Sequence, residues 1–119
     1  MILAVSSKGP TLKDSVDPRF GRAAYILIVD ADTGEFEAID NSANINAFKG
    51  AGIQTATMIS DRGAEALLTG YCGPNAFRTL QAGGVKVVSD VSGTVKEAIE
   101  HFLQGAVHYS NEPNAEGHW

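Results

Sequence analysis

Hydrophobic residues fall along this chain in short runs, separated by polar segments that contain glycine. The runs at residues 1–6 and 24–30 show no helical period, and the second is rich in β-branched and aromatic residues, so both predict buried strands. Residues 35–40 alternate polar and apolar side chains, which is typical of a half-exposed strand. With a short turn over residues 31–34, the pattern predicts a hairpin of the second and third strands.

Two polar segments flank this hairpin. Residues 7–22 and 41–50 are expected to be loops, and long ordered loops often carry function. A helix is predicted from Gly52 to about Arg62, with Gly63 as the C′ residue that ends it. The residues expected to share its buried face are Ile53, Ala56, Thr57 and Ser60.

Strands and helices alternate in the rest of the chain. Residues 64–69 predict a strand, with a helix as the competing interpretation, and residues 85–88 predict another strand. Between them a helix is expected to begin at Pro74, because proline favours the first helical position. A last helix is predicted after Thr94, which has capping-box spacing with Glu97. The apolar residues expected on the buried faces of these helices are Ala76, Phe77, Leu80, Val95, Ala98, Ile99 and Phe102.

The order of these elements predicts an α/β fold. Alternating strands and helices in the second half imply parallel strands with right-handed crossovers, whereas the first half supplies an antiparallel hairpin. The expected architecture is a mixed five-stranded sheet, with the hairpin followed by parallel βαβα units and flanked by helices. Residues 1–105 would form one domain, and the polar residues 106–119 a flexible C-terminal tail.

Composition narrows the class of protein. The chain has 119 residues, of which 44% are hydrophobic and 19% charged, as in globular single domains. Its net charge of −5 argues against a general nucleic-acid binder, which is usually basic. The single cysteine, Cys72, excludes an internal disulfide and an iron–sulfur site held by several protein thiolates.

The start of the chain carries no targeting signal that we recognise. Residues 1–5 are apolar without a preceding basic region, and no window approaches about 18 apolar residues. We therefore expect no signal peptide, no membrane span and a cytoplasmic location.

Residues that could bind a ligand lie in three segments, 7–22, 41–52 and 69–76. In this type of sheet, ligands usually bind beyond the carboxyl ends of parallel strands, near helix N-termini. Backbone N–H groups at helix starts, together with nearby arginine and lysine side chains, make an anion-binding site. The predicted site residues are Arg19, Phe20, Gly21, Arg22, Asn41, Lys49, Gly50, Gly52, Ile53, Thr69, Gly70, Cys72, Gly73, Asn75 and Ala76.

Simpler interpretations stand beside this one. The glycines can be turn residues and the cations a solvated rim. Cys72 precedes a predicted helix start, which would lower its pKa and make it a reactive thiol, but free cysteine more often packs as a small apolar residue. Cys72 is also a weak candidate for a metal ligand. His101, expected on a helix surface, and His108 and His118 in the tail lack ligand spacing.

The sequence contains none of the common catalytic motifs that we sought. There is no P-loop and no Gly-x-Ser-x-Gly elbow, and residues 1–6 hold no carboxylate of the kind a metal-dependent nuclease needs. We therefore predict a protein that is not an enzyme, and a phosphate hydrolase is the weakest alternative.

Five segments, in order, resemble the dinitrogenase iron–molybdenum cofactor biosynthesis family, which includes NifX-type cofactor carriers. The resemblance covers about residues 1–105 and is most specific in the Gly-x-x-Gly-Pro-Asn-Ala-Phe run at 70–77. It implies a ribonuclease-H-like fold. The segments are Pro18-Arg-Phe-Gly-Arg-Ala23, Lys49-Gly-Ala-Gly-Ile-Gln54, Thr69-Gly-Tyr-Cys-Gly-Pro-Asn-Ala-Phe77, Ala82-Gly-Gly-Val-Lys86 and Gly93-Thr-Val-Lys-Glu-Ala98.

The likeness to short, single-domain members implies a non-covalently held molybdenum–copper sulfide cluster, with cluster-assembly or ATPase proteins as partners. Nitrogenase-cofactor carriers of the family commonly have histidine before Phe-Gly, where this chain has Arg19. Arginine pairs with anions and does not usually ligate metals, so the departure favours an anionic cluster that brings its own sulfides. The expected function is to carry or store a preformed cluster. The alternative is a metal-free interaction or regulatory module.

Overall fold

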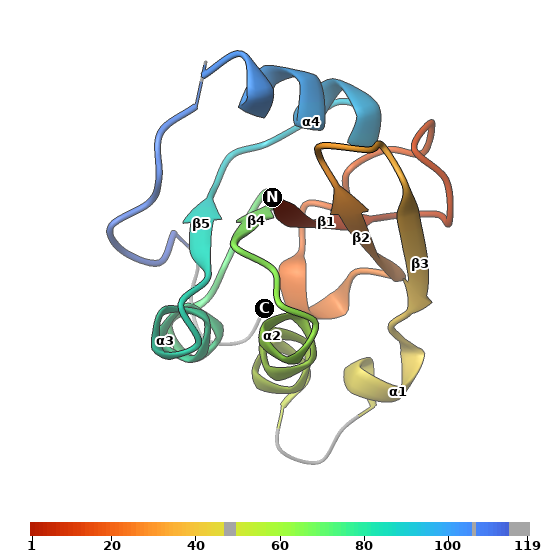
Figure 1. The fold of residues 1–119 in the computed structure, drawn as a ribbon. Helices are drawn as coiled ribbons and strands as arrows, with labels where there is room; N and C mark the ends of the chain where they lie inside the picture. The colour runs from red at the N-terminus through yellow and green to blue at the C-terminus, as the bar shows by residue number, and fades with distance from the viewer. Residues whose placement is uncertain (47–49, 106, 115–119) are drawn as a thin grey trace.

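The computed structural model describes residues 1–46, 50–105 and 107–114. Its five strands form one sheet in the order β3-β2-β1-β4-β5 (Figure 1). The strands are β1 (Ile2–Ser7), β2 (Tyr25–Asp30), β3 (Phe36–Asp40), β4 (Ala66–Leu68) and β5 (Lys86–Val88). β1, β2 and β3 pair antiparallel, whereas β1, β4 and β5 pair parallel, which confirms the predicted mixed sheet.

Helices cover both faces of the sheet (Figure 1). α2 (Ala51–Asp61) and α3 (Pro74–Ala82) lie on one face, and α4 (Val95–Leu103) lies on the other. Residues of β1 alternate between the two cores, since Ala4 packs beneath α2 and α3 while Leu3 and Val5 pack beneath α4. No helix in the described ranges is both long and apolar enough to cross a membrane.

Two local predictions about residues 41–60 are wrong. The expected loop contains a one-turn helix, α1 (Ser42–Ile45), because the Asn41 carbonyl accepts from the N–H groups of Asn44 and Ile45. The buried residues of α2 are Thr55, Ala56 and Ile59, whereas Thr57, predicted to face the core, is exposed. Thr55 tolerates burial because its hydroxyl donates a hydrogen bond to the Asn41 side chain.

The predicted helix ends agree better with the structure. Gly63 has φ of +78° directly after α2, the left-handed conformation that glycine adopts most easily. Thr94 and Glu97 form a capping box at the start of α4, in which each side chain accepts a hydrogen bond from the other's backbone N–H.

The C-terminal residues that the structure describes are not detached from the domain. Residues 107–114 run along β5 and the turn after β4, where Ser110 N–H donates to the Val87 carbonyl at 2.7 Å and Asn114 N–H donates to the Cys72 carbonyl at 3.1 Å. The expectation of a free tail misses these contacts because they join polar residues without a sequence period. Residue 106 and residues 115–119 lie outside the described part.

Candidate functional site

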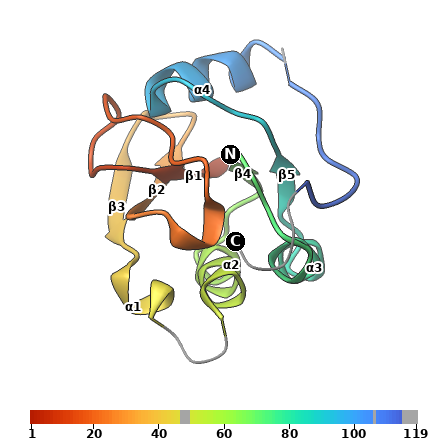
Figure 2. The same ribbon diagram turned by 180° about the vertical axis from the view of Figure 1, so that it is seen from behind.

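The predicted loop at residues 7–22 ends in a short 3-10 helix, η1 (Phe20–Arg22). At the carboxyl ends of the parallel strands, η1 lies between the start of α2 and the turn that follows β4. A Cβ atom added at Gly21 would lie 2.7 Å from the Gly52 Cα atom, so η1 packs directly against the start of α2. On the other side, a Cβ at Gly70 would lie 2.7 Å from the Pro18 Cα atom. Figure 2 shows the η1 segment (orange) beside α2 from behind. Glycine is therefore required at both contacts.

Buried hydroxyl groups attach the loop at residues 7–22 to the ends of β1 and β4. The Ser6 hydroxyl donates to the Asp17 carbonyl at 2.7 Å and is 2.8 Å from the Thr69 hydroxyl. The Asp17 N–H donates to the Ser6 carbonyl at 2.9 Å. Residues 18–20 of this loop then run beside the turn at residues 70–72. Tyr71 N–H donates to the Pro18 carbonyl, and Phe20 N–H donates to the Tyr71 carbonyl. The position of η1 is thus set by backbone contacts on both sides.

The N-terminus of α2 lies beside η1, and the N-terminus of α3 directly follows the turn at residues 70–72, which pairs with residues 18–20. α2 and α3 pack against each other and both run back from the same sheet edge, so their first turns are neighbours. Their N-cap residues are Gly50 and Gly73, no described side chain caps either helix, and neither first turn holds an acid. α4, by contrast, is capped by Thr94. The first-turn N–H groups of α2 and α3 therefore present partial positive charge without a described side-chain acceptor.

Arginine side chains add full charge at this edge. Arg19 and Arg22 are both exposed on either side of buried Phe20 and Gly21. The buried Asp17 carboxylate accepts a hydrogen bond from Arg19 N–H at 3.0 Å and lies 3.9 Å from Arg19 Nε. Asp17 therefore offsets part of the Arg19 charge while it holds that residue's backbone. Lys49, the third predicted cation, is outside the described residues.

Several predicted site residues are present at this edge but turn their side chains inward. Phe20 belongs to the core beneath α2 and α3. Asn41 is fully buried, donates to the Ala23 carbonyl at 2.9 Å and accepts from Thr55. Thr69 is fully buried against Ser6. These three side chains support the site and do not line it.

Of the two interpretations of Cys72, the structure supports the small apolar residue packed in the core and not the reactive thiol. Its side chain is fully buried in the core, and burial raises the pKa of the thiol to about 12. Desolvation disfavours the thiolate and is the cause of the raised pKa. In the described part of the chain no group of three or more His, Cys, Asp or Glu side chains could hold a metal ion. Cys72 is therefore a poor metal ligand in this conformation.

The structure places the remaining predicted residues, and adds others, along the same edge. Gly50, Gly52 and Ile53 lie at the start of α2, and Gly73, Asn75 and Ala76 at the start of α3. Sequence reasoning missed three residues: Arg78, Tyr71 and Asn114. Arg78 donates to the Asn75 side chain at 2.6 Å, a contact that its helical i, i+3 spacing could have revealed. Tyr71 is 42% exposed beside Arg19, and no sequence signal indicates Asn114.

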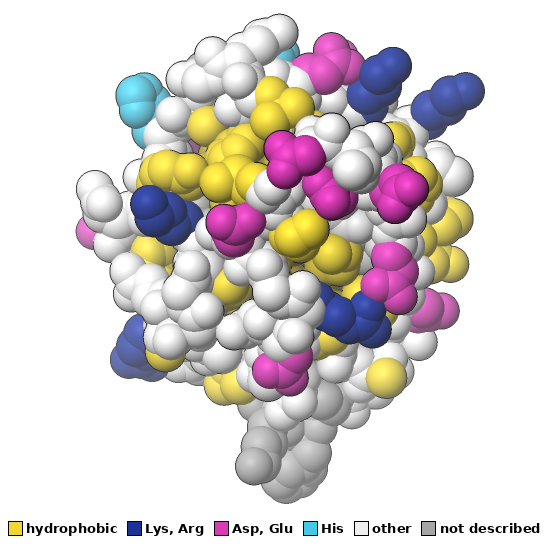
Figure 3. Space-filling model, in the orientation of Figure 1, with side chains coloured by type: hydrophobic (Ala, Val, Ile, Leu, Met, Phe, Trp, Pro, Cys, Tyr) yellow, Lys and Arg dark blue, Asp and Glu magenta, His cyan; other side chains and the backbone are white. Residues whose placement is uncertain are grey.

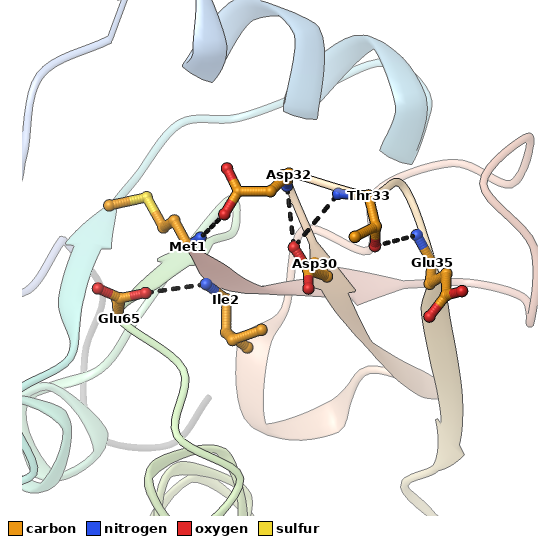
Figure 4. A network of polar contacts seen from close by, with 7 residues as sticks. All are labelled: Met1, Ile2, Asp30, Asp32, Thr33, Glu35 and Glu65. Carbon is orange, nitrogen blue, oxygen red and sulfur yellow. Dashed lines mark hydrogen bonds and ion pairs between the residues drawn. The ribbon is translucent and has the colours of Figure 1, made fainter.

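Acidic side chains gather at the opposite edge of the sheet. Figure 3 shows acidic side chains, with lysine and arginine side chains among them, across the face that contains the amino ends of β1 and β4. In Figure 4, Asp32 pairs with the Met1 ammonium group at 2.8 Å and Glu65 accepts from Ile2 N–H at 2.9 Å. The Asp32 hydrogen bond raises the pKa of that ammonium group. Part of the negative net charge therefore lies away from Arg19 and Arg22.

A pocket of about 470 Å³ also lies at the carboxyl ends of β4 and β5, but on the α4 face of the sheet and beside residues 107–110. His101 and His108 line it, and His118 lies outside the described residues. None of the predicted site residues lines this pocket. No lysine or arginine is among the described residues that line this pocket, whereas the α2 and α3 side of the same edge brings Arg19 and Arg22 together with helix N-termini, which suits an anion better.

Fold and site together define a small α/β domain with a cationic, N–H-rich edge. The model of the dinitrogenase iron-molybdenum cofactor family matches residues 1–105, and the chain belongs to this family. The resemblance noted in the sequence is thereby confirmed.

Known relatives match over most of their length. The apo form of the orange protein from Desulfovibrio gigas is 48% identical, covers 96% of both chains and superposes with a TM-score of 0.92. A Thermotoga protein of the DUF35 family is 36% identical over 98% of both chains, with a TM-score of 0.83. An uncharacterized protein of Methanocaldococcus jannaschii is 30% identical over 81% of this chain and 83% of its own.

Proposed function

We propose that this protein binds a preformed, anionic metal–sulfide cluster of the molybdenum–copper type and carries or stores it without covalent attachment. The observation that carries the proposal is the union of two helix N-termini, at Gly50 and Gly73, with Arg19 and Arg22 at one sheet edge. Membership of the dinitrogenase cofactor family and likeness to the orange protein support a cluster as the anion.

The chemistry of the donors fits a cluster that brings its own sulfides. Arginine guanidinium and backbone N–H groups bind anions but do not replace sulfide on molybdenum or copper. The buried Cys72 thiol does not supply a ready thiolate either, since its pKa is raised to about 12. The protein would therefore hold the cluster by charge and hydrogen bonds.

The proposal is tested by anaerobic reconstitution with tetrathiomolybdate and copper, followed by desalting and measurement of molybdenum, copper and visible absorption. Arg19→Ala and Arg22→Ala should each weaken retention by roughly fivefold, since an exposed charge contributes about 1 kcal/mol. Retention by the unmodified chain should fall as salt concentration rises.

Arg62→Ala is the matched control, because Arg62 is an exposed arginine at the opposite end of α2, paired with Glu37. It should retain the cluster as the unmodified chain does. Equal retention in all variants at every salt concentration would exclude charge pairing. A native protein that is colourless and takes up neither metal would favour the alternative, a metal-free interaction module of the same family.

A further inference from the structure

Asn114 joins the C-terminal segment to the turn that follows β4. Its N–H donates to the Cys72 carbonyl at 3.1 Å, and its side-chain oxygen accepts from Cys72 N–H at 2.8 Å. Its side-chain amide also donates to the Gly70 carbonyl at 3.0 Å. A single residue therefore meets three backbone groups of residues 70–72 that neither a strand nor a helix satisfies.

Residues 18–20, which include Arg19, lie on the other side of this turn. Tyr71 N–H donates to the Pro18 carbonyl at 2.6 Å, and Phe20 N–H donates to the Tyr71 carbonyl at 3.2 Å. In extended backbone, the N–H and C=O groups of neighbouring residues point to opposite sides. Residues 70–72 thus lie as a middle strand, with residues 18–20 on one side and Asn114 on the other. A shift of the turn would move Arg19 with it.

Asp90 closes the network beside Asn114. Its N–H donates to the Gly70 carbonyl at 2.9 Å, and its carboxylate accepts from the Asn114 amide at 3.3 Å. Asp90 has φ of +61°, which residues other than glycine adopt at some cost unless their surroundings hold them. The Asn114 contacts are part of what holds this residue and the turn.

The segment before Asn114 has its own attachments. Ser110 donates to Ser89 at 2.7 Å, and Lys86 lies 4.9 Å from the centre of the Tyr109 ring. Phe102 packs edge-on against the same ring. Loss of the Asn114 contacts would therefore release the turn without freeing residues 107–110.

We propose that Asn114 is a positioning residue for the cluster site, which fixes the 70–72 turn and, through it, the place of Arg19. The role in cluster retention rests on the proposed function, whereas the hold on the turn does not. Asn114 acts through backbone groups of the turn and needs no contact with the cluster.

The test uses the full chain with Asn114→Ala, and Ser110→Ala as the control that removes a neighbouring attachment. Thiol labelling with a disulfide reagent at pH 8 reports the turn, because Cys72 is buried and reacts only when this region opens. Loss of a buried hydrogen-bond partner should raise the labelling rate about tenfold in Asn114→Ala and much less in Ser110→Ala. Cluster retention should fall in the first variant and not in the second.

A paired exchange separates this role from general destabilisation. Asn114→Asp keeps the acceptor for Cys72 N–H but places a second carboxylate beside Asp90, so labelling should rise. Adding Asp90→Asn restores a donor between residues 90 and 114 and should return labelling and retention part of the way to the unmodified values, because the Gly70 carbonyl still faces a carboxylate oxygen in place of the Asn114 amide.

The outcomes are distinct. Fast labelling with unchanged retention in Asn114→Ala, or equal effects of Asn114→Ala and Ser110→Ala, would overturn the inference. Failure of the unmodified chain to take up the cluster would overturn the proposed function instead, and labelling would still decide whether Asn114 holds the turn.

Discussion

Gly21 and Gly70 show why single atoms matter at this site. Each packs so closely against backbone of another segment that an added Cβ would lie 2.7 Å from a Cα atom. The sequence marks both positions as glycine but cannot tell a close approach from an ordinary turn. Only the meeting of η1 with the start of α2 explains Gly21.

Gly21→Ala should push η1 away from α2 and move Arg22 relative to the helix N-terminus. We expect a loss of about 1–3 kcal/mol in stability, as for other overpacked positions, and weaker cluster retention. Thermal unfolding and metal retention measure the two effects. Gly34→Ala is the control, since Gly34 has φ of +81° but open space around it, and it should lose stability without losing retention. Normal stability in Gly21→Ala would contradict the close packing, and normal retention would contradict the dependence of cluster binding on the place of η1.

Cys72 predicts a pH dependence of stability. Its pKa is raised to about 12 by burial, above its ordinary value of 9.0, so the unfolded chain loses this proton first as pH rises. The stability that depends on the protonated thiol is therefore fully present below about pH 9. Between about pH 9 and pH 12 the free energy of unfolding falls by about 1.4 kcal/mol per pH unit.

Urea unfolding of the unmodified chain and of Cys72→Ala between pH 8.5 and about 10.5 isolates this thiol, because lysine and tyrosine titrate in both. The unmodified chain should lose stability more steeply. Parallel curves for the two proteins would show that the thiol is not buried as described.

The buried polar residues define the limit of sequence reasoning at this scale. Asn41 and Thr69 are polar residues next to loops, where an outward side chain is the natural expectation. Their partners, Thr55 and Ser6, are distant in sequence, so only the folded chain reveals that these groups satisfy one another.

At the scale of elements, the hydrophobic pattern predicted nearly all strands and helices because each buries one face or lies wholly inside. It failed at α1, which is too short for a period and depends on the carbonyl of Asn41. It also placed Thr57 on the wrong face of α2, since small and hydroxyl residues leave the orientation of that helix weakly defined.

The caps distinguish the helices by role. α4 is stabilised by Thr94 and Glu97, and hydrogen bonds from Thr94 lower the pKa of the Glu97 carboxyl group. Thr94→Ala should therefore reduce stability by about 1 kcal/mol and the melting temperature by about 3–6 °C.

Thr57→Ala is the matched control, because Thr57 is an exposed threonine within α2 whose hydroxyl only donates to the Ile53 carbonyl. Calorimetry or circular dichroism should find it neutral or slightly stabilising, since alanine is the better helix former. A similar loss in both variants would mean that the cap contributes nothing specific.

For the whole molecule, the candidate site is defined by the edge at which the parallel strands end. Arg19 and Arg22 lie at this edge together with Asp17, whereas Asp32 and Glu65 lie where β1 and β4 begin. The sequence predicted the convergence of the loops at this edge because parallel strands end together. It could not place Asn114, whose contact with the turn spans 42 residues and follows no pattern.

The most direct test of the central claim is to map the cluster on the protein by amide chemical shifts. Tetrathiomolybdate and copper are added anaerobically to ¹⁵N-labelled protein. The largest changes should fall on Arg19, Arg22, Gly52, Ile53 and Gly73. Changes confined to the pocket at His101 and His108, with these five amides unmoved, would contradict the assignment of the site.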